Sequence, residues 1–216
     1  NRMGGDCLNT GCVPSKALIR AAKFVHQARQ AEKIGIKRAT EEFEVTDNMQ
    51  RVHDVIARIE PHDSIERYTK LGVEVIQGEA RLASPWSVEV NGQILTAKSI
   101  IIAAGAEPLL PPIKGIETVH PLTSDNVWQL KRLPKRMLVL GGGPIGCELA
   151  QSFARLGSDV TQVEMLPRLM IREDEEVSDY IQQRFEAEGV RVLCTYRAIE
   201  FLNQDGRKSL LCEHAG

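Results

Sequence analysis

Two stretches of the chain repeat apolar residues at intervals of three and four, the spacing that gathers side chains on one face of a helix. The first runs from Lys16 to Ala31 and is expected to end near Gly35. The second is predicted to begin with Asp47 as its N-cap and to reach Ile59. Pro61 should then separate it from a further helical piece.

Strand-like patterns follow the helices. Residues 73–82 alternate and are rich in β-branched side chains, which predicts a strand. Residues 88–90 and 94–96 flank Asn91-Gly92, the dipeptide most typical of a tight hairpin. Residues 99–104 are continuously apolar, which predicts a strand buried on both faces. A small antiparallel sheet is therefore expected ahead of a buried strand.

From residue 136 onward the pattern alternates between strand and helix. Strands are predicted at 136–140, 159–164 and 190–194, and helices at 148–156 and 174–189. This alternation is typical of a parallel sheet flanked by helices. A final hairpin is expected around Asp205-Gly206. The chain is therefore assigned to the α/β class.

Composition excludes several classes of function. The 216 residues carry a formal net charge of -2 with scattered Lys and Arg, so no nucleic acid partner is expected. No apolar run approaches the roughly 20 residues that cross a bilayer, and no signal peptide is recognisable, so the protein is expected to be soluble and cytoplasmic. Five cysteines form an odd number, which favours one functional pair over a disulfide framework.

A glycine-rich turn between a predicted strand and a helix gives the first indication of chemistry. Gly141, Gly143 and Gly146 satisfy the Gly-x-Gly-x-x-Gly pattern of dinucleotide-binding turns, with Pro144 and Ile145 between them. In such turns the first glycine allows the bend, the second lets backbone approach a pyrophosphate, and the third lets helix and strand pack closely. N–H groups at the helix N-terminus would bind the phosphates. A glycine-rich turn without a ligand is the alternative.

The acid that ends the next predicted strand supports the nucleotide interpretation. Glu164 follows Gly141 by 23 residues, close to the separation expected for an acid that binds a ribose 2′-hydroxyl. A carboxylate would repel a 2′-phosphate, so NAD is predicted in preference to NADP. Arg168 lies four residues further on and could moderate this preference.

The second candidate site lies near the start of the chain. Cys7 and Cys12 are five residues apart, with Gly4, Gly5 and Gly11 around them. A Pro-Ser pair soon after the second cysteine indicates a helix start, where the partial positive charge favours a thiolate. The glycines would let two sulfurs approach and a flat cofactor lie against the main chain. A structural disulfide or two unrelated reduced cysteines remain alternatives, whereas zinc is not predicted because no second ligand pair lies nearby.

Residues 4–16, Gly-Gly-Asp-Cys-Leu-Asn-Thr-Gly-Cys-Val-Pro-Ser-Lys, resemble the redox-disulfide signature of the flavoprotein disulfide reductases, the class I pyridine nucleotide-disulfide oxidoreductases. The resemblance implies that Cys7 exchanges with the substrate and that Cys12 lies against FAD. It also implies an ion pair beside the flavin between Lys16 and Glu148. These four side chains are therefore the expected catalytic residues.

Two positions depart from the family pattern. Asp6 stands where many members have Thr, and Ala104 replaces the usual Thr of the element Ala-Thr-Gly-x-x-Pro. The resemblance still implies that Ala104 and Gly105 pass close to the flavin. Any hydrogen bond from the missing threonine hydroxyl is lost.

The resemblance implies a Rossmann-like FAD- and NAD(P)-binding fold, incomplete at both ends. Residues 1–115 would form a partial FAD-binding domain and residues 116–216 an NAD-binding domain. The first flavin-binding strands and the dimerisation domain of the family are expected outside this chain, and the intact protein is expected to be a homodimer. In the family, NADH reduces FAD, the flavin reduces the disulfide, and the dithiol reduces a small-molecule substrate, or the sequence runs in reverse. Dihydrolipoamide is the favoured substrate, with mercuric ion as the alternative. The isolated chain could also be a nucleotide-binding piece with little or no turnover.

Overall fold

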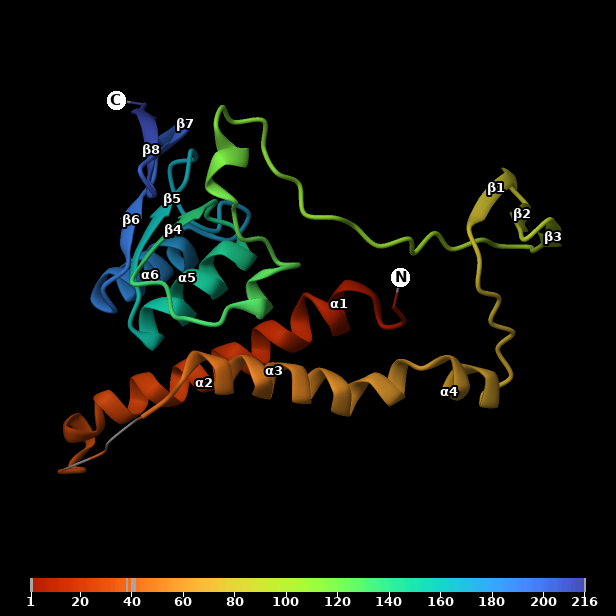
Figure 1. The fold of residues 1–216 in the computed structure, drawn as a ribbon, viewed down its shortest axis with the longest axis horizontal. Coiled ribbons are helices and arrows are strands. Elements are labelled where there is room, and N and C mark those ends of the chain that lie inside the picture. Colours follow the sequence, from red (N-terminus) through yellow and green to blue (C-terminus); the bar gives the residue numbers. More distant parts are fainter. Residues whose placement is uncertain (1, 38, 40–41, 216) are drawn as a thin grey trace.

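The computed structural model describes residues 2–37, 39 and 42–215 (Figure 1). Its first part is helical. The α-helices are α1 (Gly5–Asn9), α2 (Cys12–Arg29), α3 (Val45–Ile59) and α4 (Ile65–Lys70), with 3-10 turns at Ala31–Ile34 and Glu60–Asp63. Helices α2 and α3 lie side by side through their apolar faces, which include Leu18 and Val52, both fully buried.

The helix boundaries differ from the sequence prediction in detail. Helix α2 begins at Cys12 and ends at Arg29. The 3-10 turn that follows it is capped at its end by Gly35, which adopts the left-handed conformation with φ 82°. Helix α3 has Glu44 as its N-cap, so the prediction of Asp47 as the cap is wrong, and Asp47 lies within the first turn. An acid there still interacts favourably with the helix dipole, which explains the misleading signal. The division at Pro61 is confirmed by the 3-10 turn that contains it.

A small antiparallel sheet follows. It contains β1 (Ala80–Ser84), β2 (Ser87–Val90) and β3 (Gln93–Thr96) in that order. The hairpin at Asn91-Gly92 is confirmed, because both residues have positive φ, 51° and 76°, as the tight turn requires. The strand predicted over residues 73–82 is wrong for residues 73–79, which pair with no strand among the described residues.

The prediction of a doubly buried strand at residues 99–104 is wrong. This stretch is extended but pairs with no strand in the described part of the chain, and Ile101 and Ile102 are 89% and 72% exposed. An apolar run becomes a buried strand only where neighbouring strands satisfy its N–H and C=O groups. Figure 1 shows it within a long extended connection between β3 and the later α/β unit.

The α/β unit begins after two 3-10 turns, Ile116–Val119 and Val127–Gln129. Its parallel sheet has the order β4-β5-β6 and is followed by the antiparallel hairpin β7–β8, as predicted. The bounds are β4 (Arg136–Leu140), α5 (Pro144–Leu156), β5 (Asp159–Val163), α6 (Glu175–Ala187), β6 (Arg191–Leu193), β7 (Tyr196–Gln204) and β8 (Arg207–His214). Helix α5 starts at Pro144 rather than Glu148, because proline is favourable in a first helical turn.

One hydrophobic core joins the first helices to the α/β unit. Helix α2 packs against α5, and the buried cluster runs from Ala22 through Ala150 to Phe153. Trp128 adds a polar link, since its Nε1–H donates to the Thr10 carbonyl at 3.0 Å. The domain boundary near residue 115 stays a prediction. Within the described residues, no helix combines the length and apolarity that crossing a membrane requires.

Candidate functional site

The two cysteines are brought together by a tight return of the chain. Cys7 lies in α1 and Cys12 is the first residue of α2, and both are exposed free thiols. The Asp6 carbonyl accepts hydrogen bonds from the N–H groups of Thr10 and Gly11, at 2.9 and 2.5 Å. A Cβ on Gly11 would lie 2.9 Å from that carbonyl oxygen. Glycine at this position therefore permits the close approach.

The cysteine side chains interact with each other. A hydrogen bond with the Cys12 side chain is the main cause that raises the pKa of Cys7 above its ordinary value, and burial adds to it. The backbone N–H of Cys12 opposes the shift by donating to the Cys7 sulfur. The two exposed thiols are therefore neighbours.

Lys16 and Glu148 form the ion pair that the family resemblance implied. The Lys16 Nζ lies 2.6 Å from Oε1 and 2.8 Å from Oε2 of Glu148. Because the two side chains are 60% and 34% exposed, such a pair contributes at most about 1 kcal/mol to stability. Its consequence is geometric: one turn from their starts, it joins α2, which begins at Cys12, to α5, which follows the glycine-rich turn.

The glycine-rich turn has the shape that its sequence predicts. Gly141 has φ 106°, which only glycine adopts readily, and the turn delivers the chain to Gly143, the N-cap of α5. A Cβ on Gly146 would lie 2.4 Å from the Gly141 carbonyl, so close packing there requires glycine. No atom lies within 4 Å of a Cβ built on Gly143. The turn is therefore packed underneath and open at Gly143, with Pro144 and Ile145 starting the helix beside this opening.

Glu164 lies immediately after β5, against the glycine-rich turn. Its carboxylate accepts from the Gly142 N–H at 2.5 Å and from the Leu166 N–H at 2.8 Å. Sequence reasoning missed the first of these contacts. Arg168 is engaged elsewhere, because its Nη2 donates to the carbonyls of Ile171 and Glu173 at 3.3 and 3.2 Å.

The residues predicted beside a flavin meet around Asp6. The Ala106 N–H donates to Asp6 Oδ2 at 3.2 Å, which holds the exposed Ala104-Gly105 segment against the residue that precedes Cys7. Gly105 has φ 79°, and Gly4 and Gly5 also have positive φ, 84° and 54°. The aspartate that departs from the family pattern thus has a defined partner, which the sequence did not reveal.

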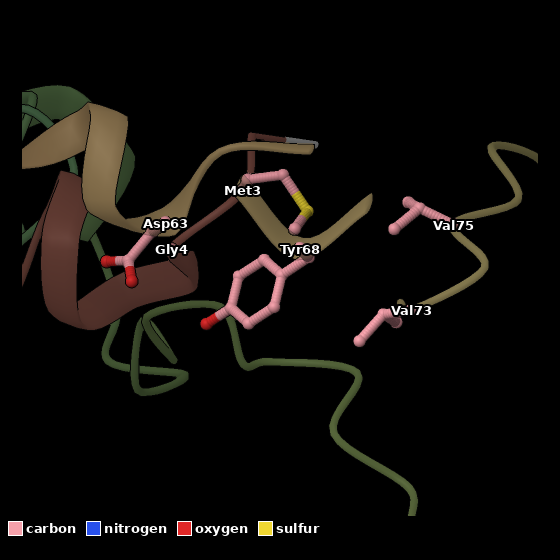
Figure 2. Close-up of a pocket in the computed structure, with 6 residues that line it drawn as sticks. All are labelled: Met3, Gly4, Asp63, Tyr68, Val73 and Val75. Carbon is pink, nitrogen blue, oxygen red and sulfur yellow. The ribbon is translucent and has the colours of Figure 1, made fainter. Parts of the chain in front are cut away.

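A shallow hollow of about 470 Å³ adjoins the cysteine segment (Figure 2). Tyr68, Val73 and Val75 line it, from α4 and the segment that follows α4. Gly4, which also lines it, lies three residues before Cys7. The charge of Asp63, another lining residue, also contributes to the raised pKa of Cys7. The lining residues are Met3, Gly4, Asp63, Tyr68, Val73 and Val75.

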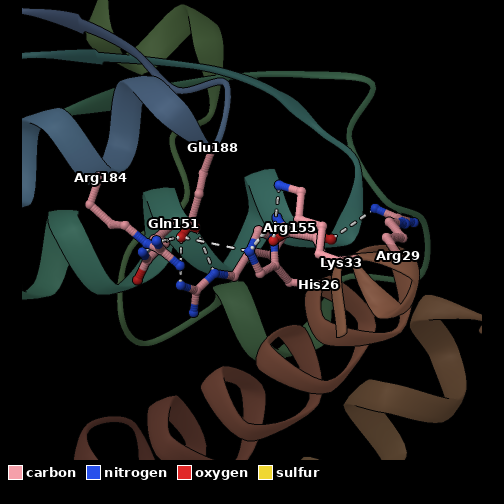
Figure 3. Close-up of polar contacts among 8 residues, drawn as sticks. His26, Arg29, Lys33, Gln151, Arg155, Arg184 and Glu188 are labelled. Carbon is pink, nitrogen blue, oxygen red and sulfur yellow. Dashed lines mark hydrogen bonds and ion pairs between the residues drawn. The ribbon is translucent and has the colours of Figure 1, made fainter. Parts of the chain in front are cut away.

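A buried polar cluster joins α2, α5 and the end of α6 (Figure 3). The Glu188 side chain is only 3% exposed, and its carboxylate lies 2.7 Å from Nε of Arg155 and 2.7 Å from Nε of Arg184. Burial acts to raise the pKa of Glu188, but Arg155, His26 and Arg184 together hold it below its ordinary value. Burial lowers the pKa of His26, against the opposing charge of Glu188. Sequence reasoning missed this cluster, since the residues are far apart in the chain and belong to no motif.

These features define a class of protein. A parallel strand, a glycine-rich turn, a helix and an acid after the next strand form a dinucleotide-binding α/β unit, and a dithiol pair is attached to the helix packed against it. Residues 2–214 match the family described as pyridine nucleotide-disulphide oxidoreductase. The chain belongs to this family.

Relatives with two named activities resemble the chain. It is 34% identical over 200 residues to a mercuric reductase of Lysinibacillus sphaericus, covering 92% of this chain and 37% of that protein. It is 37% identical over 217 residues to a dihydrolipoyl dehydrogenase of Thermus scotoductus, covering 97% and 45%. Among solved structures, the HOCl-induced flavoprotein disulfide reductase RclA from Escherichia coli matches with a TM-score of 0.78 and 28% identity, covering 98% and 45%. The chain thus spans less than half the length of each.

Proposed function

We propose that the chain carries the redox disulfide and the nicotinamide nucleotide site of an NAD- and FAD-dependent disulfide oxidoreductase. The observation that supports this most is the interacting pair Cys7 and Cys12, in α1 and at the start of α2. The Lys16–Glu148 ion pair joins α2 to the helix of the glycine-rich turn. Electron transfer between nucleotide and disulfide requires such a spatial link between the two motifs.

The cysteines perform thiol–disulfide exchange. The Cys7 thiolate attacks one sulfur of a substrate disulfide, and the other substrate sulfur leaves as a thiolate that takes up a proton. The Cys12 thiolate then attacks the Cys7 sulfur, which releases the second substrate thiol and closes the Cys7–Cys12 disulfide. The substrate gains two electrons and the protein dithiol loses two, so the exchange balances and runs equally in reverse. We assign Cys7 to the substrate side and Cys12 to the flavin side.

The residues fit a nicotinamide nucleotide. The free space at Gly143 and the N-terminal N–H groups of α5 suit a pyrophosphate, and the Glu164 carboxylate suits ribose hydroxyls. Arg168 already donates to two main-chain carbonyls, which reduces its availability for a 2′-phosphate. NAD is therefore favoured over NADP.

The cysteine segment also fits a flavin. Gly4, Gly5 and Gly105 expose main chain without side chains, and the Lys16–Glu148 pair lies one helical turn from Cys12. When bound, FAD would supply the electron transfer between nicotinamide and disulfide. The role of the chain is to hold the two thiols and the ion pair in place for it.

Dihydrolipoamide and its disulfide are the favoured substrate pair, and mercuric ion is the second candidate. A mercuric reductase and a dihydrolipoyl dehydrogenase resemble the chain to a similar degree. An exposed dithiol suits either substrate. Exchange with lipoamide distinguishes the two candidate substrates, because it requires the attack of Cys7 on a substrate disulfide.

The nucleotide part is tested by calorimetric titration of the chain with NADH and with NADPH. We expect NADH to bind more tightly. The opposite order would remove Glu164 from its assigned role, and binding of neither nucleotide would contradict the nucleotide site itself.

The disulfide part is tested by mixing the reduced chain with lipoamide and mapping disulfides by mass spectrometry. We expect a Cys7–Cys12 disulfide and one equivalent of dihydrolipoamide. Cys212→Ser is the matched control, because Cys212 is a half-buried thiol in β8, and it should leave the product unchanged. Equal oxidation of Cys7→Ser and the unmodified chain would refute the pairing.

A further inference from the structure

A glutamine is fully buried in the central strand of the parallel sheet. Gln162 in β5 has no exposed surface, although its neighbours Val160 and Val163 are apolar and equally buried. Its Nε2 donates to the Gly141 carbonyl at 2.9 Å and, more weakly, to Cys147 Sγ at 3.5 Å, while its Oε1 has no partner among the described residues. Such a site would ordinarily hold an aliphatic side chain, because a buried polar group is unfavourable unless it is hydrogen-bonded. The amide is therefore retained for the bond that it makes.

The Gly141 carbonyl requires this donor. The Gly141 N–H still continues the sheet by donating to the Val163 carbonyl at 2.8 Å. The positive φ of Gly141 then turns its carbonyl away from the ladder and beneath the first turn of α5, where it faces Gly146. A carbonyl in this part-buried position without a donor would be destabilising, because it loses hydrogen bonds to water. Gln162 supplies the donor from the strand below.

The other end of the same peptide and the peptide that follows it are also fixed by hydrogen bonds. The Gly142 N–H donates to Glu164, and the Gly142 carbonyl accepts from the Met170 N–H at 2.8 Å. The turn is thus held by hydrogen bonds at two consecutive peptides, immediately before Gly143, where the space is open.

We propose that Gln162 is a positioning residue of the nucleotide site. By fixing the direction of the Gly141 carbonyl, it sets the orientation of the peptides that lead to Gly143 and so shapes the surface that faces a pyrophosphate. The proposal rests on the proposed function for its ligand, whereas the ordering of the turn does not depend on any ligand.

The test compares Gln162→Met with Val160→Ala. Methionine keeps the length of the side chain and removes the donor, whereas Val160 is on the same face of β5 two residues earlier and contacts no part of the turn through a hydrogen bond. Titration with NADH by calorimetry is expected to give a Kd about fivefold weaker or more for Gln162→Met. Val160→Ala is expected to lower Tm and leave Kd unchanged at a temperature where it is folded.

Hydrogen exchange of the nucleotide-free chain gives a readout that needs no ligand. In Gln162→Met the Gly142 amide, which donates to Glu164, is expected to exchange faster relative to the rest of the sheet, and in Val160→Ala it is not. Gln162→Glu should recover affinity at low pH, where a protonated carboxyl can donate to the Gly141 carbonyl, and lose it as pH rises and the carboxyl ionises. This variant decides the question if Gln162→Met does not fold.

The outcomes separate the two proposals. If the unmodified chain binds neither NADH nor NADPH, the proposed function fails, and the amide exchange of Gly142 still decides the role of Gln162. If the chain binds NADH and Gln162→Met has the same Kd and the same amide exchange as the unmodified chain, the positioning role is overturned.

Discussion

Alanine at two glycines of the same turn should separate folding from binding. At Gly146 a Cβ would lie 2.4 Å from the Gly141 carbonyl oxygen, a backbone atom that cannot move aside cheaply. Overpacking of this kind costs about 1–3 kcal/mol, whereas helix propensity alone would favour alanine by up to about 1 kcal/mol. The net cost is then at most about 3 kcal/mol, and for a chain of this size we expect Gly146→Ala to lower Tm by up to roughly 12 °C.

Gly143→Ala should give the reverse result. Its φ of -76° suits alanine, and no atom lies within 4 Å of the new Cβ. The loss of a favourable N-cap destabilises the fold, whereas the reduced freedom of the unfolded chain stabilises it. Because these effects offset each other, the free energy of unfolding should change by no more than about 1 kcal/mol. The methyl group would occupy the space assigned to the pyrophosphate, and we expect the Kd for NADH to rise about tenfold, equivalent to about 1.4 kcal/mol.

Thermal unfolding and calorimetric titration of both variants measure the two effects. A stabilised Gly146→Ala would show that the contact with the Gly141 carbonyl relaxes freely. Unchanged NADH binding by Gly143→Ala would place the pyrophosphate elsewhere and refute the reasoning for this turn.

Three further predictions concern the other polar groups. The pKa of His26 is lowered in the folded state, so folding favours its neutral form. The free energy of unfolding should therefore fall as pH drops below the unfolded-state pKa of about 6.5. His26→Gln should flatten this part of a urea-denaturation pH series. Arg155→Met should cost about 3–5 kcal/mol in chemical denaturation by leaving Glu188 buried with weakened compensation, and an additional Glu188→Leu should recover part of the loss; a cost below 1 kcal/mol would contradict the importance of the pair. Cys12→Ala removes the main cause that raises the pKa of Cys7, so alkylation of Cys7 should begin at lower pH, and an unchanged profile would mean that the thiols do not interact.

Local patterns gave the parts of the site that depend on short stretches of sequence. The glycine-rich turn and the Asn91-Gly92 hairpin were predictable, because positive φ and close packing select glycine regardless of the distant fold. The start of α2 at Cys12 followed from the helix signals around Pro14. The Lys16–Glu148 pair came only from the family resemblance, because no local signal joins residues 132 positions apart.

The remaining contacts depend on which segments meet in space. Residues 99–104 have the apolar composition of a buried strand, but composition does not provide the neighbouring strands that such burial requires. Gln162 has the sequence context of an ordinary strand residue, and only the folded chain brings the Gly141 carbonyl beside it. The Asp6–Ala106 contact joins an unusual residue to a segment a hundred positions away, which no periodicity indicates.

The two candidate sites are mechanically linked through α2 and α5. At one end of the pair, Lys16 binds Glu148, and at the other end Arg29 donates to the Arg155 carbonyl at 2.9 Å while His26 faces Glu188. Between these ends lies the buried apolar contact of the two helices, which close packing makes rigid. Helices fixed at both ends and along their length do not slide independently. Cys12 at the start of α2 and the glycine-rich turn at the start of α5 should therefore move as one body.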